Sequence, residues 1–301
     1  YISAKKIKLK NPIFNDFQID RLVLGNFTAS FGQGVVFESS DFFSPRRTGF
    51  GFSKRLNGIH PDETKNSQYT LKGLGLQLSN KLLRLSMFAS KDTRDAIINE
   101  DGTFSSLIVM QPRISWGLGQ DGDTTVFHSL TDSVEEITLG AEIRISPIEG
   151  TNLGFMLYES LYNRELKPQI RETILGGSDP DYSGDNYYLA YITNSADPEI
   201  AAMYESSAVS EIFDSIKASR KVMGVNFSSV ISNISIQGEY GALVENFGSA
   251  ANFLDNFTNA PKAMVLSSYF QFNNFNLLTL YRNYDLHFDN PYQRSFSNYN
   301  R

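Results

Sequence analysis

The sequence predicts an all-β fold: an antiparallel up-and-down transmembrane β-barrel, or a partial barrel, with long extracellular loops and one loop helix. Three observations lead to this prediction. Apolar residues recur at every second position, short turns alternate with long polar segments, and no run of about 18 apolar residues could form a membrane helix. About 12 strands fit this pattern, and residues 1–301 are interpreted as a single segment of a barrel.

The chain combines many aromatic residues with a polar average. It contains 23 Phe and 15 Tyr, yet its mean hydropathy is −0.27. Strands with one apolar and one polar face explain both numbers, because successive side chains of a strand point to opposite faces. The net charge of −6 argues against a nucleic-acid-binding surface, which usually needs a basic domain or stripe.

The clearest alternation covers residues 136–146. Aliphatic side chains occupy every second position there, and Thr, Gly, Glu, Arg and Ser fill the positions between them. Similar alternation marks residues 73–79, 83–90, 153–157, 233–239 and 264–272. These segments are predicted to be half-buried strands, because strands buried on both faces would appear as continuous apolar runs.

The lengths of the connections favour a meander with two unequal ends. Short polar breaks at 79–81, 147–152 and 273–274 separate pairs of strands. Long polar stretches lie between those pairs, at about 41–67, 92–105, 117–133, 163–186 and 244–261. Tight turns on one side and long loops on the other are typical of outer-membrane barrels. A soluble antiparallel sandwich or barrel has the same period and remains the alternative.

Aromatic residues close to the predicted strand ends favour the membrane form. In outer-membrane barrels such residues form girdles at the two membrane interfaces. The residues assigned to these girdles are Phe42, Phe43, Tyr187, Tyr188, Tyr281, Tyr284 and Tyr292.

One segment departs from the period of two. Ser195 or Asp197 can cap a helix, and Pro198 suits its first turn. Apolar residues with approximately helical spacing follow. We expect a helix inserted between two strands, at about 197–218.

Two aromatic segments resemble a known family. The first comprises 22–27 (LVLGNF) and 31–36 (FGQGVV); the second comprises 280–284 (LYRNY), then Phe288, 290–292 (NPY), Phe296 and Ser297. They resemble segments of large outer-membrane barrels of Bacteroidota-type bacteria, usually named for an N-terminal helix-hairpin-helix region. That region is absent here, so the resemblance implies no DNA-related role, and it implies no catalytic residues. The glycines of the first segment are expected to allow a bulge or a tight backbone passage.

Charged residues on the predicted polar faces form the main candidate site. Glu142 and Arg144 share one face of their strand, and Gln237 and Glu239 share a face of another. Together with Arg84, the residues Glu142, Arg144 and Glu239 are predicted to form a charge network in the lumen. Such a network would either line a pore or fill the lumen with paired charges. Tyr69, Lys72 and Arg282 are further candidates for it.

A metal site has one weak candidate. Asp179, Asp181, Ser183 and Asp185 place oxygen ligands at alternate positions before a turn, as at the start of a calcium loop. The twelfth position is Ala190 and not the expected Glu, so a solvated turn is the alternative interpretation. Calcium is therefore the one cofactor considered.

Catalysis is not predicted. The absence of Cys excludes Cys-based catalysis and Cys-ligated metal sites. His128 and His287 have no nucleophile–base partner that spacing identifies, and Glu135 and Glu136 point to opposite faces of one strand.

The sequence thus predicts a protein of the outer membrane of a Gram-negative bacterium, in contact with lipid. It would act as a pore or transporter, or as the barrel component of an envelope complex. The alternatives are a scaffold that presents its loops to a protein partner, and a soluble β-sandwich or barrel binding module. Because the chain begins at Tyr1 and ends at Arg301 in a polar segment, we expect it to be a piece of a longer or processed protein.

Overall fold

The computed structural model describes residues 2–8, 17–39, 57–62, 70–98, 103–107, 132–166, 218–244, 257–285, 288 and 290–293. These residues form an all-β structure. Its strands are β1 (Ile2–Lys8), β2 (Gln18–Ser30), β3 (Gly58–Pro61), β4 (Leu71–Ser79), β5 (Leu83–Arg94), β6 (Ala96–Ile98), β7 (Phe104–Leu107), β8 (Val134–Ile148), β9 (Thr151–Tyr162), β10 (Ala218–Ile231), β11 (Ile234–Leu243), β12 (Lys262–Gln271) and β13 (Asn276–Tyr284). No helix of the described residues is long and apolar enough to cross a membrane.

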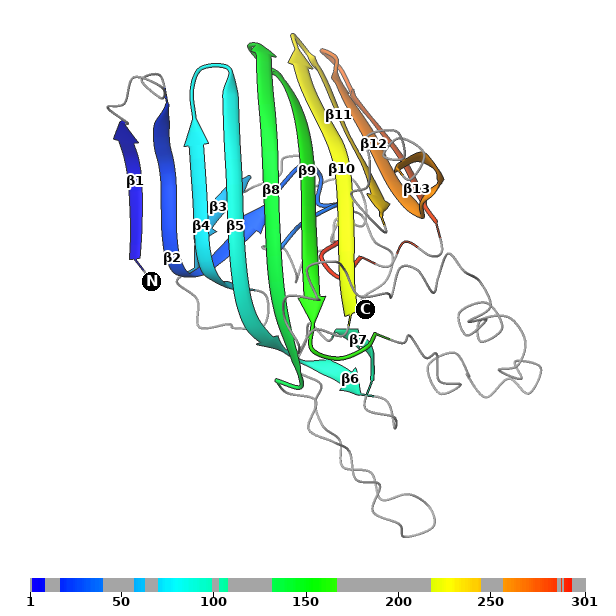
Figure 1. Ribbon diagram of the computed structural model, residues 1–301. Helices are drawn as coiled ribbons and strands as arrows, with labels where there is room; N and C mark the ends of the chain where they lie inside the picture. Colours follow the sequence, from blue (N-terminus) through cyan, green and yellow to red (C-terminus); the bar gives the residue numbers. More distant parts are fainter. Residues whose placement is uncertain are drawn as a thin grey trace, which may run out of the picture. The chain divides into compact units, whose positions relative to one another are not determined.

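Eleven strands form one sheet, in the order β1-β2-β4-β5-β8-β9-β10-β11-β12-β13 with β3 added to β2 (Figure 1). Along this order the strands follow their sequence order, with β3 and the separate pair β6–β7 as interruptions, and the registers that the structure defines are antiparallel. The meander predicted from the sequence is therefore confirmed. Within the described residues β1 and β13 are the two edges and do not pair with each other, and closure into a barrel stays a prediction.

The chain divides into two compact units. The first comprises Tyr1–Asp92, Ile137–Ser160 and Arg220–Arg301, and the second Thr93–Glu136 and Leu161–Ser219. The second unit contains the pair β6–β7. Its apolar core consists of Ala96, Phe104, Val134, Tyr162, Leu166 and Ala218.

Short turns lie where the sequence predicts them. β4 and β5 are joined at 80–82, β8 and β9 at 149–150, and β12 and β13 at 272–275. Asn80 fixes the first turn, because its side-chain oxygen accepts hydrogen bonds from the Leu82 and Leu83 N–H groups (2.9 and 2.7 Å). Gly150 occupies the second with φ = 81°, a value that favours glycine.

Several strands were not predicted. β5 runs to Arg94 and β6 follows it, so the long polar loop expected at 92–105 is wrong in its first part. β10 was not predicted either, because its first half contains the charged residues Arg220 and Lys221, which are buried in the structure. Ala218, the last residue of the expected helix, begins β10, and the rest of that helix lies outside the described residues.

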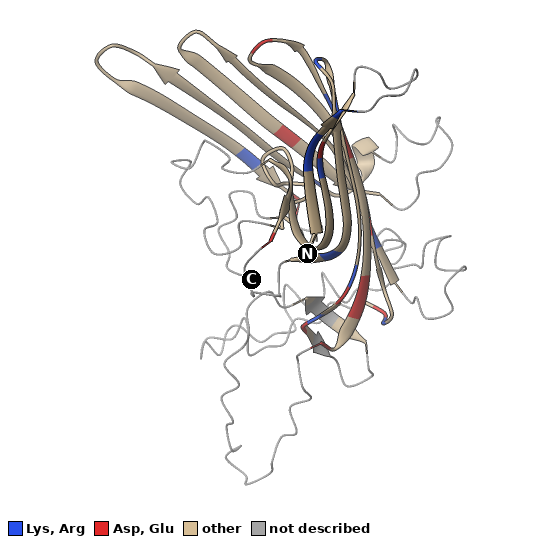
Figure 2. Ribbon diagram, turned by 90° about the vertical axis from the view of Figure 1, so that its left-hand side faces the viewer, with Lys and Arg blue, Asp and Glu red and all other residues tan. Residues whose placement is uncertain are grey.

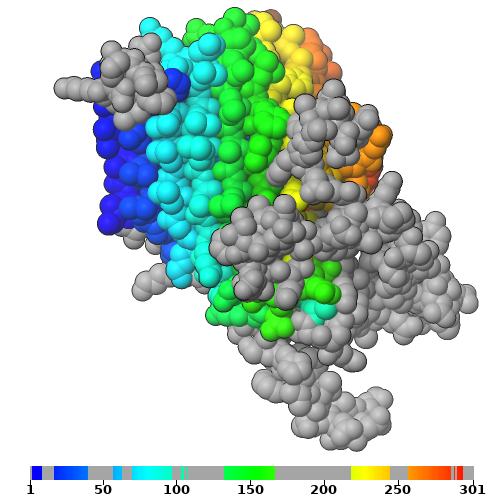
Figure 3. Space-filling model, in the orientation of Figure 1, coloured from blue at the N-terminus to red at the C-terminus, as the bar shows by residue number. Residues whose placement is uncertain are grey.

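The two faces of the sheet differ in burial: one is buried and carries hydrophilic as well as apolar side chains, and the other exposes large aliphatic side chains. One face, here called the polar face, buries hydrophilic side chains: Gln77, Ser79, Ser86, Ser90, Thr138, Glu142, Arg144, Ser160, Glu239 and Ser267. The other, the apolar face, exposes Leu24, Leu74, Met87, Leu139, Ile143, Ile145, Leu153, Val225, Phe227, Ile236 and Leu266. Figure 2 shows where charged residues lie along the strands. Figure 3 shows one side of the sheet as an unbroken series of strands.

Gly140 of β8 lies close to the ring of Phe88 on the polar face. A Cβ atom there would lie 2.3 Å from Phe88 Cζ, and the buried Phe88 ring contacts Phe37 with centroids 4.8 Å apart. Gly140→Ala is therefore expected to lower the free energy of unfolding by about 1–3 kcal/mol, measured by denaturant titration. The control Ala141→Val changes the opposite face and should have little effect. An unchanged midpoint for Gly140→Ala would contradict this packing.

Candidate functional site on the polar face

A close ion pair on the polar face joins Glu142 and Arg144, which lie two residues apart on β8. Arg144 Nη2 lies 2.5 Å from Glu142 Oε1, and the Glu142 side chain is fully buried. The two side chains meet because residues two apart on a strand point to the same face. Arg144 Nη2 also donates to Asn57 Oδ1 (2.7 Å). A buried ion pair of this kind requires added hydrogen bonds to offset the cost of desolvation.

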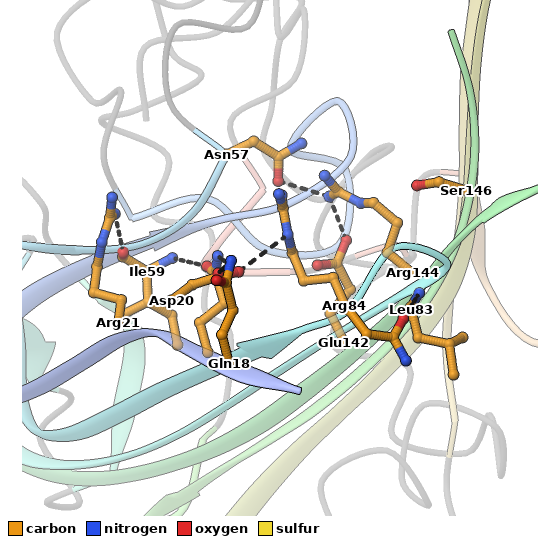
Figure 4. Close-up of polar contacts among 12 residues, drawn as sticks. Gln18, Asp20, Arg21, Asn57, Ile59, Leu83, Arg84, Glu142, Arg144 and Ser146 are labelled. Atoms are coloured by element: carbon orange, nitrogen blue, oxygen red, sulfur yellow. Dashed lines mark hydrogen bonds and ion pairs between the residues drawn. The ribbon is translucent and has the colours of Figure 1, made fainter. Parts of the chain in front are cut away.

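A second polar group surrounds Asp20. Its carboxylate accepts hydrogen bonds from Gln18 Nε2 (2.9 Å) and Gln77 Nε2 (3.3 Å), and Arg84 Nε lies 4.0 Å away. A β-bulge between Ile19 and Arg21 places Asp20 there, because it adds one residue to β2. Figure 4 shows this group and the Glu142–Arg144 pair in one view.

The strand β3 borders this polar group. Arg21 Nη1 donates to the Ile59 carbonyl, and Ile59 N–H donates to Gln77 Oε1 (3.3 Å). The partial burial of His60 lowers its pKa below the usual value, and the nearby Arg21 charge lowers the pKa further. His60 is consequently favoured in its neutral form beside the guanidinium.

Glu239 has a separate role on the same face. Its carboxylate accepts hydrogen bonds from the N–H groups of Gln33, Val35 (3.1 Å) and Val36 (2.9 Å). Positive φ angles at Gly32 (49°) and Gly34 (79°) turn these N–H groups toward one point. The arrangement is a backbone nest filled by a side-chain anion. The expected backbone role of these glycines is confirmed.

Asn290 holds the same segment from the other side. Its Nδ2 donates to the carbonyls of Val35 (2.9 Å) and Val36 (2.8 Å). Its Oδ1 accepts hydrogen bonds from Tyr158 Oη and from Tyr292 N–H (3.0 Å). The two segments that carry the family resemblance therefore contact each other directly. Together with Glu239, these bonds fix residues 31–39, here called the inner segment, against the polar face.

Aromatic rings complete the packing of the inner segment. Phe37 stacks on Tyr292 with ring centroids 4.3 Å apart, and it contacts Tyr158 at 4.9 Å. Phe31 stacks on Phe88 of β5 at 6.2 Å. Tyr292 is buried here, so its assignment to a membrane-interface girdle is wrong.

Other predicted girdle residues have different outcomes. Tyr281 is exposed on the apolar face, whereas Phe42, Phe43, Tyr187 and Tyr188 lie outside the described residues. Phe272 and Phe275, which were not among the predicted girdle residues, are exposed and stack with centroids 4.5 Å apart in the turn between β12 and β13. They form an exposed aromatic pair at a strand end.

The predicted charge network is brought together only in part. Glu142 and Arg144 pair directly, and Arg84 lies closest to Asp20, which the sequence did not single out. Glu239 binds the inner segment instead. Lys72 is largely exposed and lies 3.7 Å from Asp92, away from these groups. No signal in the sequence indicates Asp20 or Asn57. Asn290 belongs to a segment that carries the family resemblance, but its contacts could not be predicted, because they join segments distant in sequence.

The second unit has its own buried ion pair. Arg94 Nε lies 2.7 Å from Glu136 Oε2, and Tyr162 Oη donates to Glu136 Oε1 (3.1 Å). Glu135 is exposed while Glu136 is buried, so the prediction that the two point to opposite faces is confirmed.

The remaining candidates are the calcium-like loop and three single residues. The calcium-like residues Asp179, Asp181, Ser183 and Asp185, and also Tyr69, His128 and His287, lie outside the described residues. In the part of the chain that the structure describes, no three His, Asp or Glu side chains are grouped to hold a metal ion. Comparison with models of known families, with curated proteins and with solved structures gave no significant match.

Glu239 is expected to control the inner segment. Glu239→Gln removes the charge that the three backbone N–H groups share, and hydrogen bonds to charged groups contribute about 1.5–3 kcal/mol each. Amide hydrogen exchange at Gln33, Val35 and Val36 should accelerate at least about tenfold. The matched control is Glu149→Gln, in an exposed turn, which should leave these amides protected. Unchanged protection in Glu239→Gln would refute the assignment.

Proposed function

We propose that this chain is all or part of an outer-membrane β-barrel of a Gram-negative bacterium, with its apolar face against lipid. The observation that carries the proposal is the exposure of large aliphatic side chains on one face. Leu139, Ile143 and Leu153 are 42, 48 and 50% exposed, whereas Glu142 on the other face is 0% exposed. A sheet in water would gain free energy from the opposite arrangement, since burying apolar surface is favourable and burying charge is costly. Lipid outside and polar groups inside remove this conflict.

A soluble sandwich fits these observations less well. It would need a second layer over the apolar face, because sandwiches bury their apolar sides between two sheets. Among the described residues, the 31–39 and 290–293 segments pack on the polar face, and the aliphatic side chains opposite remain exposed. The family resemblance and the exposed Phe272–Phe275 pair at a turn support the membrane proposal further.

Within the barrel, we propose passage of small solutes through a polar interior. The buried polar face supplies Ser, Thr, Gln, Arg and Glu side chains along several neighbouring strands. Such side chains line aqueous channels in outer-membrane barrels.

A scaffold is the second candidate, and the inner segment favours it. Residues 31–39 are buried against side chains of β5, β9 and β11 and are held by Glu239 and Asn290. A segment fixed across the interior would obstruct passage. The protein would then act through its loops, as the barrel of an envelope complex with a protein partner.

The membrane proposal is tested with a matched pair of substitutions. Leu139→Arg places a charge in the middle of the apolar face and should cost about 2–4 kcal/mol in lipid, while Leu82→Arg, in the turn between β4 and β5, should cost about 0–1 kcal/mol. Both residues are exposed to a similar extent, 42 and 49%, so a water-soluble protein would tolerate both equally. Urea titration of the protein refolded in lipid vesicles measures the difference. Equal stabilities, or extraction without detergent, would reject the proposal.

Conductance separates the two candidate functions. A pore should give stable single-channel currents in planar bilayers, which Glu239→Gln should increase if the inner segment narrows the path. A barrel that seals the bilayer and co-purifies with a stable partner would support the scaffold and rule out the pore.

A further inference from the structure

The polar face carries an excess of cationic side chains in one place. Register puts Lys5 opposite Arg21, Arg21 opposite Gln77 and Gln77 opposite Ser86, in one row across β1, β2, β4 and β5. The adjacent row places Ser79 opposite Arg84. Residues directly opposite each other share a face of the sheet, so both rows belong to the polar face.

Arg144 extends the second row. β5 and β8 are neighbours, and Ser146 N–H donates to the Leu82 carbonyl (2.8 Å). Arg84 and Arg144 lie two residues further along these antiparallel strands and therefore at the same level. Figure 4 shows both side chains on the same side of the sheet. Two guanidinium groups at facing positions repel each other unless anions lie between them.

The anions present do not balance these cations. Glu142 pairs with Arg144 at 2.5 Å, and Asp20 is 4.0 Å from Arg84. In the part of the chain that the structure describes, Arg84 thus has one long ion pair, and Arg21 donates to the neutral carbonyl of Ile59. Among the described residues, the groups placed here by register and ion pairing are four cations, including Lys5, and two carboxylates.

Several of these residues also carry hydrogen-bonding atoms that have no partner among the described residues. The Nε atoms of Arg21, Arg84 and Arg144 and the Oγ of Ser86 are buried and have no hydrogen-bond partner among the described residues. Glu142 Oε2 is the one unpartnered acceptor of this group. Buried polar atoms are almost always satisfied by protein, water or a ligand. The three Nε atoms can only donate, so the partner they lack accepts hydrogen bonds. Beside several guanidinium groups an anionic acceptor is favoured over a neutral one.

We propose that these side chains form a binding site for a small oxyanion, a phosphate or carboxylate group of a solute. Arg84, Ser86 and Arg144 would donate to its oxygens, Arg21 would supply further positive charge, and Glu142 would hold Arg144 in place. Guanidinium groups suit this role because they donate two parallel hydrogen bonds to an oxyanion. The inference rests on the proposed pore for the route by which a solute reaches the site, and it makes that pore selective for anions.

Calorimetric titration with inorganic phosphate tests the site, using the full chain in micelles of an uncharged detergent. Wild-type protein should bind phosphate saturably. Arg84→Gln should weaken binding at least about tenfold, because it removes a charged donor. Glu142→Gln should strengthen binding several-fold, because it removes the competing negative charge while keeping the shape of the side chain. Ser86→Ala, which changes no charge, should weaken binding to a smaller extent.

Lys81→Gln is the matched control. It removes one positive charge from the exposed turn beside β5 and should leave phosphate binding unchanged. Equal weakening by Lys81→Gln and Arg84→Gln would show a nonspecific charge effect and overturn the site. Binding that requires an anionic phospholipid in the micelle would indicate a lipid headgroup and overturn the solute proposal.

The same samples separate this inference from the proposed function. A barrel should migrate differently on gels before and after heating. A protein that shifts on heating but binds no phosphate would overturn the site alone. A protein that does not shift would overturn the barrel, and with it the route to the site.

Discussion

Alternation of side chains across a strand is the constraint on which the rest of this structure depends. Every strand of the sheet must give its odd and even positions different surroundings. In β8 this puts Leu139, Ile143 and Ile145 on the exposed side, and Glu136, Glu142 and Arg144 on the buried side. The charged residues Glu136, Glu142 and Arg144 of β8 therefore share one face, and each has an ion-pair partner there.

The partners found there explain the local structure. Glu142 is paired with Arg144 on its own strand, Asp20 reaches Gln77 through a bulge, and Glu239 satisfies a turn of backbone N–H groups. Two side chains hold the inner segment in place. Glu239 accepts hydrogen bonds from its N–H groups, and Asn290 donates to its carbonyl groups. Around Arg84 the described residues provide one long ion pair and leave the Nε atom without a hydrogen bond. This is where we propose that the face binds an anion.

The sequence predicts the regular part of this fold well. Alternation identifies β4, β5, β8, β9, β11 and β12, and it assigns Arg84, Glu142 and Arg144 to one face. Alternation does not identify some strands that contain several charged residues. Examples are β10, in which Arg220 and Lys221 are buried, and β1, which contains several lysines. It also cannot indicate contacts such as Gln33 to Glu239 or Val35 to Asn290, because these join residues more than 200 positions apart and depend on the complete fold.

The central claim is that the apolar face lies against lipid, and the natural absence of cysteine allows a direct measurement. Single cysteines placed in turn at positions 138–146 of β8 can carry a fluorescent label in vesicles that contain brominated lipid. The account predicts strong quenching at 139, 141, 143 and 145 and weak quenching at the positions between them. Uniform quenching, or none at any position, would contradict the claim.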